Sequence, residues 1–181
     1  MESNKEKLTN CFENEIYELP DFYEHIIGSD PKEKGVKNIF VSKIQDNDHY
    51  AYVIFKVDTY CRGVKSVEMG CNLTESEYQN RKTEYLNTIS KNEPHNLAYL
   101  HNLIYGAYDF AEQYGCKAHK DFGIAENILN TDLIDDGIDQ IEFGKNGIPH
   151  YIARKGENIN LILNQLIRRL GEGNFGFEVE K

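Results

Sequence analysis

Short motifs that mark several well-known enzyme classes are missing from this 181-residue sequence. It contains no G-x-x-x-x-G-K-[ST], no G-x-G-x-x-G, no G-x-S-x-G and no H-E-x-x-H. These motifs shape phosphate-binding loops, dinucleotide sites, serine nucleophile elbows and zinc-binding helices, in that order. The sequence therefore excludes the best-marked P-loop, dinucleotide-binding, esterase and zincin classes.

Closely spaced cysteines are also missing. The sequence forms no C-x-x-C pair, and its four cysteines are Cys11, Cys61, Cys71 and Cys116. Zinc knuckles and the disulfide frameworks of small secreted domains need regularly spaced cysteines. The pattern therefore predicts reduced thiols.

No long hydrophobic run is present. The amino-terminal residues 1–7 carry no apolar region of a signal peptide, and no later stretch approaches the length that crosses a bilayer. We therefore expect neither export nor membrane insertion, and we expect a cytoplasmic protein.

Positive charge is scarce relative to negative charge. The chain has 20 Lys and Arg against 30 Asp and Glu, a formal net charge of -10. Such a field repels phosphates at long range, so we do not expect broad nucleic-acid binding. A bound divalent cation or a local basic pocket can still reverse the sign at one site. With 40% hydrophobic residues, the chain has enough apolar side chains for a packed core.

The sequence divides into a polar amino-terminal segment and one folded domain. Residues 1–35 are interrupted by proline and glycine, and we predict an extension with one short helical turn around residues 22–27. Residues 36–181 show neither a repeat nor a linker. We predict a single α+β domain there.

Three strands are predicted at the start of this domain. Residues 38–42 and 50–57 form a hairpin around the polar turn 45–48, and a weaker strand follows at residues 64–73. Residues 50–57 are apolar at nearly every position, which is typical of a strand that is covered on both faces.

Helices are predicted next. A capping box formed by Thr74 and Glu77 begins the first, and Asp121 caps the third. Between them, apolar residues spaced by three and four predict a helix at residues 95–114. Glycine in a helix interior costs about 1 kcal/mol relative to alanine. Gly106 therefore predicts a close neighbour in the middle of this helix.

The carboxy-terminal part completes the predicted fold. Asn146-Gly147 lies between apolar runs and predicts a hairpin at residues 141–153. A helix at residues 159–170 and a short strand at residues 175–179 follow. The prediction is an α+β fold in which a mainly antiparallel sheet, with three amino-terminal strands and a carboxy-terminal hairpin, packs against a block of helices.

Polar groups at the ends of these elements give a candidate site. Asp58 ends a buried strand, His101 flanks the apolar stripe of the central helix, and His119 lies at the start of the next helix. Lys65 and Asp121 complete the set. We predict that these side chains converge at one end of the first sheet as catalytic groups. The predicted chemistry is phosphate binding, or metal-assisted or general-base attack on a phosphodiester or related ester.

A divalent cation is the cofactor that this site would take. Asp58, His101 and His119 are its predicted ligands, because carboxylates and imidazoles ligate such ions. The site would make the protein a metal-binding hydrolase.

Each candidate also has a structural interpretation. His101 can close the core through a hydrogen bond, Asp121 can act as a helix cap alone, and Asp58 can be a solvated strand end. Cys61 is a candidate nucleophile, with either histidine as base and Asn102 or Asp121 as the orienting group. No known nucleophile motif surrounds Cys61.

A different class of function stays open. The 12 tyrosines offer amphipathic contacts for a protein partner or a small ligand. The alternative hypothesis is a non-catalytic interaction or small-ligand-binding domain, whose ligand would be a small molecule or a nucleotide-like compound. We expect no membrane partner under either hypothesis.

Four segments of the chain resemble a family of uncharacterised bacterial proteins. They are residues 55–65, 101–107, 118–122 and 141–147. In that family an Asp-x-x-Cys-x-Gly-Val-Lys turn, a His-Asn-x-Ile-Tyr-Gly-Ala helix, a Pro-His-x-Asp-Phe segment and a Phe-Gly-Lys-x-Gly hairpin follow one another in this order. The resemblance covers residues 35–177 and implies a bacterial, cytosolic origin without naming an activity.

The chain departs from the family pattern at two positions. Ala118 stands where proline is common, and Arg62 stands where an apolar residue is usual. Loss of the proline makes the entry to the following helix less rigid, which affects the placement of His119.

Overall fold

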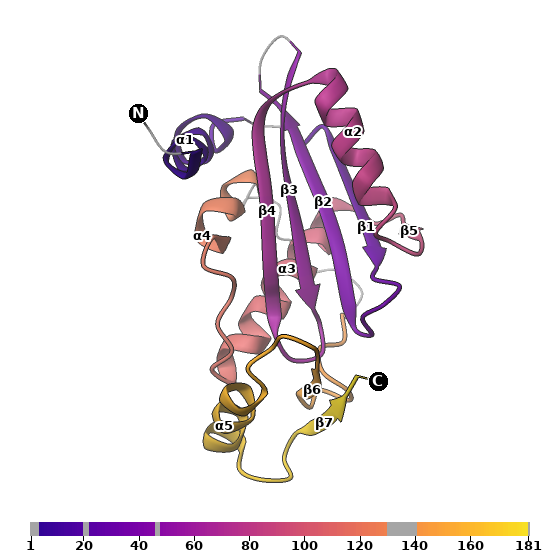
Figure 1. The fold of residues 1–181 in the computed structure, drawn as a ribbon, viewed down its shortest axis with the longest axis vertical. Helices are drawn as coiled ribbons and strands as arrows, with labels where there is room; N and C mark the ends of the chain where they lie inside the picture. The colour runs from indigo at the N-terminus through magenta and orange to yellow at the C-terminus, as the bar shows by residue number, and fades with distance from the viewer. Residues whose placement is uncertain (1–3, 20–21, 46–47, 130–140, 181) are drawn as a thin grey trace.

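A five-stranded antiparallel sheet forms the middle of the computed structural model (Figure 1). The strands lie in the order β4-β3-β2-β1-β5. Their bounds are β1 (Glu24–Ser29), β2 (Val36–Ile44), β3 (His49–Asp58), β4 (Gly63–Thr74) and β5 (Asn92–Glu93). The structure describes residues 4–19, 22–45, 48–129 and 141–180.

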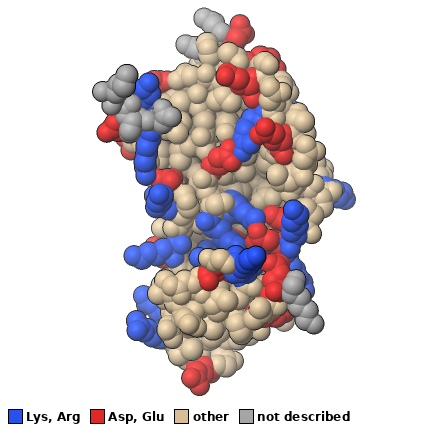
Figure 2. All heavy atoms as spheres, in the orientation of Figure 1, with Lys and Arg blue, Asp and Glu red and all other residues tan. Residues whose placement is uncertain are grey.

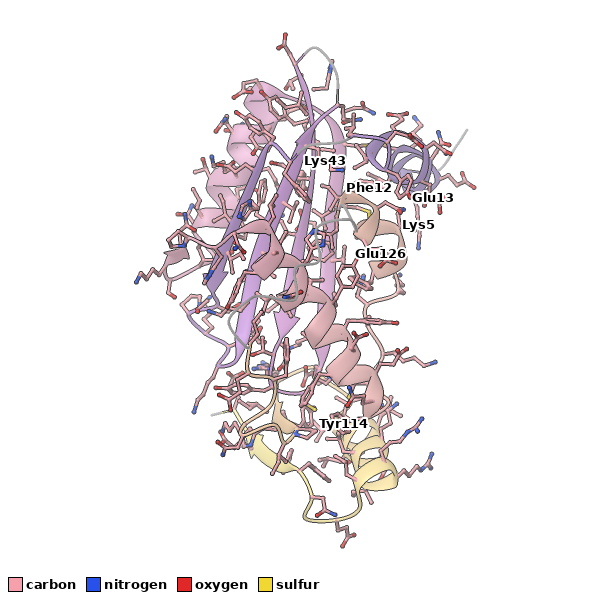
Figure 3. All side chains as sticks on the ribbon, turned by 180° about the vertical axis from the view of Figure 1, so that it is seen from behind. Lys5, Phe12, Glu13, Lys43, Tyr114 and Glu126 are labelled. Atoms are coloured by element: carbon pink, nitrogen blue, oxygen red, sulfur yellow. The ribbon has the colours of Figure 1, made fainter. Side chains whose placement is uncertain are left out.

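Helices cover both faces of this sheet. The helix α2 (Glu75–Leu86) lies on one face, and α3 (Leu97–Gln113) crosses the other (Figures 1 and 3). Four short helices lie near β4: α1 (Asn4–Cys11), η1 (Phe12–Ile16), α4 (Phe122–Ala125) and η2 (Glu126–Ile128). A carboxy-terminal unit contains β6 (His150–Ala153), α5 (Ile159–Leu170) and β7 (Gly176–Val179). No helix within the described ranges is long and apolar enough to cross a membrane.

Alternating side chains of β3 build a core on each face of the sheet. Val53 and Phe55 are buried on the α3 face. Tyr52 and Ile54 pack on the α2 face with Tyr85. Burying one large apolar side chain contributes roughly 1.5–3 kcal/mol, so both faces stabilise the strand. The prediction that β3 is covered on both faces is confirmed.

The predicted capping box places α2, and α3 forms where its apolar spacing predicts. The Thr74 hydroxyl accepts a hydrogen bond from the Glu77 N–H, and the Glu77 carboxylate accepts one from the Thr74 N–H. Asn96 caps α3 by accepting from the Tyr99 N–H at 2.8 Å. Gly115 follows α3 with a φ of 80°, a left-handed conformation that glycine adopts without strain.

A buried lysine connects the amino-terminal segment to the sheet. Lys43 on β2 has a fully buried side chain, and its ammonium donates to the carbonyls of Ile16 at 3.3 Å and Leu19 at 2.6 Å (Figure 3). These carbonyls lie at the end of η1, where the helix dipole favours a cation. The contact therefore fixes η1 against the sheet.

Two predictions of secondary structure are wrong. The predicted helical turn is instead β1, which pairs with β2 and β5, so the amino-terminal segment contributes an inner strand. In the predicted hairpin the turn forms, with positive φ at Asn146 and Gly147, but β6 pairs in parallel with β7. Phe143, in the run before the turn, packs against α3 instead of pairing with β6.

Candidate functional site

The β3–β4 turn, residues 59–62, and the first residues of β4 bind two loops that come from distant parts of the chain. The N–H of Gly144 donates to the carbonyl of Thr59 at 2.9 Å, and the N–H of His119 donates to that of Val64 at 2.9 Å. Buried backbone groups need such partners, so each bond fixes a loop against the sheet. The turn therefore holds together segments that are far apart in the sequence.

Glycines let these segments pack closely. A Cβ added at Gly63 would lie 2.8 Å from both the carbonyl oxygen of Ala107 and the Cβ of Ala111. A Cβ at Gly106 would lie 2.5 Å from the ring of Phe143, which confirms the predicted close neighbour. The glycines of these motifs thus have a packing role in the fold.

Asp58 is bound by the turn that it precedes. Its Oδ1 accepts hydrogen bonds from the N–H groups of Tyr60 at 2.8 Å and Cys61 at 3.1 Å. Its Oδ2 accepts one from Arg154 Nη1 at 3.2 Å. Burial raises the pKa of Asp58, while Arg154 acts in the opposite direction. These bonds give the carboxylate a structural role at the sheet end.

Glu33 is the centre of a charged cluster beside Asp58. Its carboxylate accepts a hydrogen bond from Lys65 Nζ at 3.0 Å and forms an ion pair with Lys56. It also lies 2.9 Å from Arg154 Nε, an ion pair whose geometry is not that of a hydrogen bond. Burial favours the neutral carboxyl, but the bonds from Lys56 and Lys65 outweigh it and lower the pKa of Glu33. Through this Glu33 cluster, two of the predicted site residues, Asp58 and Lys65, become neighbours.

His101 lies in the core under the sheet and not at its border. The residue is fully buried, its ring meets Phe22 edge-on, and neither ring nitrogen has a hydrogen-bond partner in the described structure. Burial lowers the pKa of His101 below its ordinary value of 6.5. The ring is therefore held neutral at pH 7.

Replacing His101 with leucine is expected to weaken the pH dependence of stability. Because the folded-state pKa is lowered, the unfolded chain binds the proton more readily, and stability falls as the pH drops below about 6.5. Urea unfolding at about pH 7.5 and about pH 5.5 should show a smaller loss in the variant, by on the order of 1 kcal/mol. A His119→Gln variant is the control, and equal losses in His101→Leu and wild type would contradict the prediction.

His119 and Asp121 contact each other at the start of α4. The His119 ring is partly exposed, and its Nδ1 lies 3.9 Å from Asp121 Oδ2. Asp121 accepts a hydrogen bond from Lys5 Nζ at 2.9 Å, which lowers its pKa. Within the described chain the Asp121 side chain makes no capping bond to α4, so the prediction that Asp121 caps this helix is wrong. The pair is thus part of a surface contact between α1 and α4.

The predicted site residues fall into three sets of contacts. Asp58 and Lys65 belong to the Glu33 cluster, His119 pairs with Asp121, and His101 lies in the core. Among the residues that the structure describes, no group of three or more His, Cys, Asp or Glu could hold a metal ion. Asp58, His101 and His119 therefore do not form the predicted metal site.

Cys61 is buried and contacts Cys116. The hydrogen bond with the Cys116 thiol and burial both raise the pKa of Cys61. Because the thiolate is the nucleophile, a protonated buried thiol is unsuited to catalysis. This environment favours a structural Cys61.

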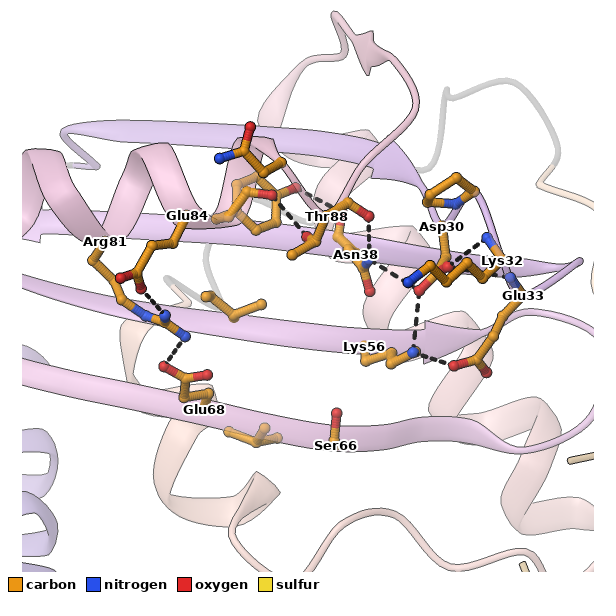
Figure 4. Close-up of a pocket in the computed structure, with 15 residues that line it drawn as sticks. Asp30, Lys32, Glu33, Asn38, Lys56, Ser66, Glu68, Arg81, Glu84 and Thr88 are labelled. Atoms are coloured by element: carbon orange, nitrogen blue, oxygen red, sulfur yellow. Dashed lines mark hydrogen bonds and ion pairs between the residues drawn. The ribbon is translucent and has the colours of Figure 1, made fainter. Parts of the chain in front are cut away.

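A pocket of about 670 Å³ lies between α2 and the sheet, and none of the five predicted site residues lines it (Figure 4). The loop after β1, the strands β2 to β4 and the helix α2 all contribute to its walls. Ile54 and Tyr85 supply apolar surface. We call this cavity the α2 pocket.

Two charged walls face each other across the α2 pocket. On one side Lys56 Nζ lies 3.1 Å from Asp30 Oδ2 and also pairs with Glu33. Those partners outweigh burial and raise the pKa of Lys56. We call this the Lys56 wall (Figure 4).

The opposite side is the Arg81 wall. Arg81 on α2 pairs with Glu68 on β4 and with Glu84 one turn along the helix. Its Nε also donates to the Tyr52 hydroxyl at 3.1 Å. Figure 2 shows basic and acidic side chains together at more than one place on this face.

Sequence reasoning missed the α2 pocket because its parts come from distant segments. One signal was present: Lys56 is a charged residue inside the apolar run of residues 50–57. In a strand covered on both faces, such a residue needs a partner or a cavity. Lys56 has both.

Comparison of the chain with models of known protein families, with curated proteins and with solved structures finds no match.

Proposed function

We propose that this chain binds a small dipolar ligand in the α2 pocket. The observation that supports the proposal is one cavity of about 670 Å³ with apolar surface between two charged walls. Ligand pockets for small organic molecules have volumes of about 300–1,000 Å³. A molecule with a cationic group, an anionic group and an apolar centre complements these walls.

The walls keep enough polar capacity for a ligand. Exposed ion pairs contribute only about 0–1 kcal/mol, so a ligand group can join or replace a partner at low cost. Glu68 and Glu84 are largely exposed beside Arg81. Lys32 and Ser66 line the pocket and are exposed. A cationic ligand group fits the carboxylates, and an anionic group fits the cations Lys32, Lys56 and Arg81.

Binding is favoured over catalysis at this place by the chemistry of the lining. Among the described residues that line the α2 pocket there is neither a histidine nor a cysteine. The cations Lys56 and Arg81 have raised pKa values and stay charged. General-base catalysis requires a side chain whose pKa lies near neutral pH. Short peptides combine all three required groups, whereas nucleotides supply an anion and a ring but no cation at neutral pH.

Thermal unfolding with a panel of dipeptides, tripeptides and nucleotides at low ionic strength tests this proposal. A compound at about 100 times its Kd stabilises the protein by about 2.7 kcal/mol, which raises the Tm by several degrees. A Ser66→Trp variant, which places a large ring in the pocket, should lose this rise. An Arg81→Gln variant should bind about tenfold more weakly, because one charged contact contributes about 1.4 kcal/mol.

Lys82→Gln is the matched control. Lys82 neighbours Arg81 on α2 and pairs with Glu24, but it does not line the pocket. Binding should be unchanged in this variant. Equal loss in Lys82→Gln and Arg81→Gln, or a ligand response that survives Ser66→Trp, would place the site elsewhere.

A further inference from the structure

The fold brings all four cysteines into two contacting pairs. The thiols of Cys11 and Cys71 are hydrogen-bonded to each other, and so are those of Cys61 and Cys116. All four are free thiols. Because the members of each pair are far apart in the sequence, their spacing gives no sign of the pairing.

The two pairs differ in their access to solvent. Cys61 and Cys116 are both buried in the small core that includes α5. Cys11 is 3% exposed, but its partner Cys71 is only partly buried on β4. A dissolved oxidant must reach at least one sulfur atom. The Cys11–Cys71 pair is therefore the pair at which oxidation can begin.

The Gln45 side chain connects the two cysteines, because its Oε1 accepts from the N–H of Asn72, the neighbour of Cys71, at 2.6 Å, while its Nε2 donates to Cys11. Asn72 Nδ2 donates to Cys71 Sγ at 3.8 Å, and Gln45 Nε2 donates to Cys11 Sγ at 3.5 Å. The hydrogen bond from the Cys11 thiol lowers the pKa of Cys71. Cys71 is also the more exposed sulfur of the pair, so it is the one that a dissolved disulfide reaches and that attacks first.

The strand is irregular at this point. Tyr50 pairs with Leu73 while Tyr52 pairs with Gly70, so β4 carries an extra residue beside Cys71. Bulges of this kind re-aim side chains and interrupt the ladder locally. A disulfide requires specific Cβ positions, and a bulged strand adjusts to them with less disruption than a regular one.

We propose that Cys11 and Cys71 form an oxidation site, at which a low-molecular-weight disulfide such as oxidised glutathione converts the two thiols into one intramolecular disulfide. The Cys71 thiolate attacks one glutathione sulfur and releases the first glutathione. The Cys11 thiolate then attacks Cys71 Sγ and releases the second. Two electrons pass from the cysteines to the glutathione disulfide, and the two cysteine protons end on the released thiols.

The new bond would fasten the amino-terminal helices to the edge of the sheet. Cys11 is the last residue of α1, and α1 packs against β4, which carries Cys71. A disulfide between residues 11 and 71 closes a long loop of the chain. It therefore restricts the unfolded state and raises the relative stability of the folded state. Oxidation should therefore raise the Tm by roughly 5–15 °C.

Incubation of the full chain with oxidised glutathione, followed by non-reducing peptide mass spectrometry and thermal unfolding, tests the proposal. The expected product is a linked pair of peptides that contain Cys11 and Cys71, with a raised Tm that a reductant reverses. Cys71→Ser, at a partly exposed position, should abolish both results. Cys116→Ala should keep both, because it removes only the buried pair.

Three outcomes would overturn the proposal. One is a link between Cys61 and Cys116 in place of the expected one. Another is glutathione that remains on Cys71 without transfer to Cys11. The third is four unmodified thiols under excess oxidant in a protein whose unfolding transition shows that it is folded.

Discussion

Replacement of Arg154 by methionine is expected to destabilise the fold by about 3–5 kcal/mol. The side chains of Arg154 and Asp58 are 6% and 2% exposed, and their ion pair measures 3.2 Å. Removing the guanidinium leaves the buried Asp58 carboxylate without its ion-pair partner, and it also removes the bond from Arg154 to the Lys34 carbonyl at 2.9 Å. Urea unfolding at neutral pH measures the loss.

The double variant Asp58→Asn with Arg154→Met separates charge from packing. Asparagine keeps an oxygen for the N–H groups of Tyr60 and Cys61, but it carries no charge. The double variant should therefore be more stable than Arg154→Met alone by about 1–2 kcal/mol. Strictly additive losses in the two single variants would show that the buried pair does not stabilise the turn in this way.

Replacement of Gly63 by alanine should cost about 3 kcal/mol. Gly63 has a φ of 62°, which strains a residue with a Cβ, and the new Cβ would meet the α3 backbone at Ala107 O, 2.8 Å away. Strain and overpacking each contribute about 1–3 kcal/mol. Because a backbone atom of a packed helix cannot move aside easily, α3 would have to shift from β4.

Gly173→Ala is the control for Gly63→Ala. Gly173 has a φ of 82°, and among the described residues nothing lies within 4 Å of a Cβ added there. The variant should therefore show the conformational strain alone, about 1 kcal/mol. Equal losses at Gly63 and Gly173 would show that close packing of the β3–β4 turn on α3 contributes nothing.

Signals that act within a few residues of the sequence correctly predicted the helices α2 and α3. The capping box at Thr74 places α2, and apolar spacing places α3, because each signal acts within a few residues. The parallel pairing of β6 with β7 was missed because α5 lies between the two strands. The turn at Asn146 predicted instead that β6 pairs with the run of residues just before the turn. β1 was missed because proline and glycine lie around a short run.

The candidate site was predictable only in part, for the same reason. The neighbourhood of Asp58 and Lys65 follows from one turn in the sequence. Their partners Glu33 and Arg154 come from a loop and from the carboxy-terminal unit, and these partners turn the charges into a structural cluster. Sequence spacing cannot show such contacts, nor can it show that the flank of α3 at His101 is covered.

Amide chemical shifts of the ¹⁵N-labelled protein, titrated with the best compound of the panel, test the central claim most directly. Binding in the α2 pocket predicts saturable shift changes that are largest at the amides of Lys56, Ser66 and Arg81. The amide of His119 should change little. Saturable changes around His119 with none at Lys56 would contradict the assignment of the binding site to the α2 pocket.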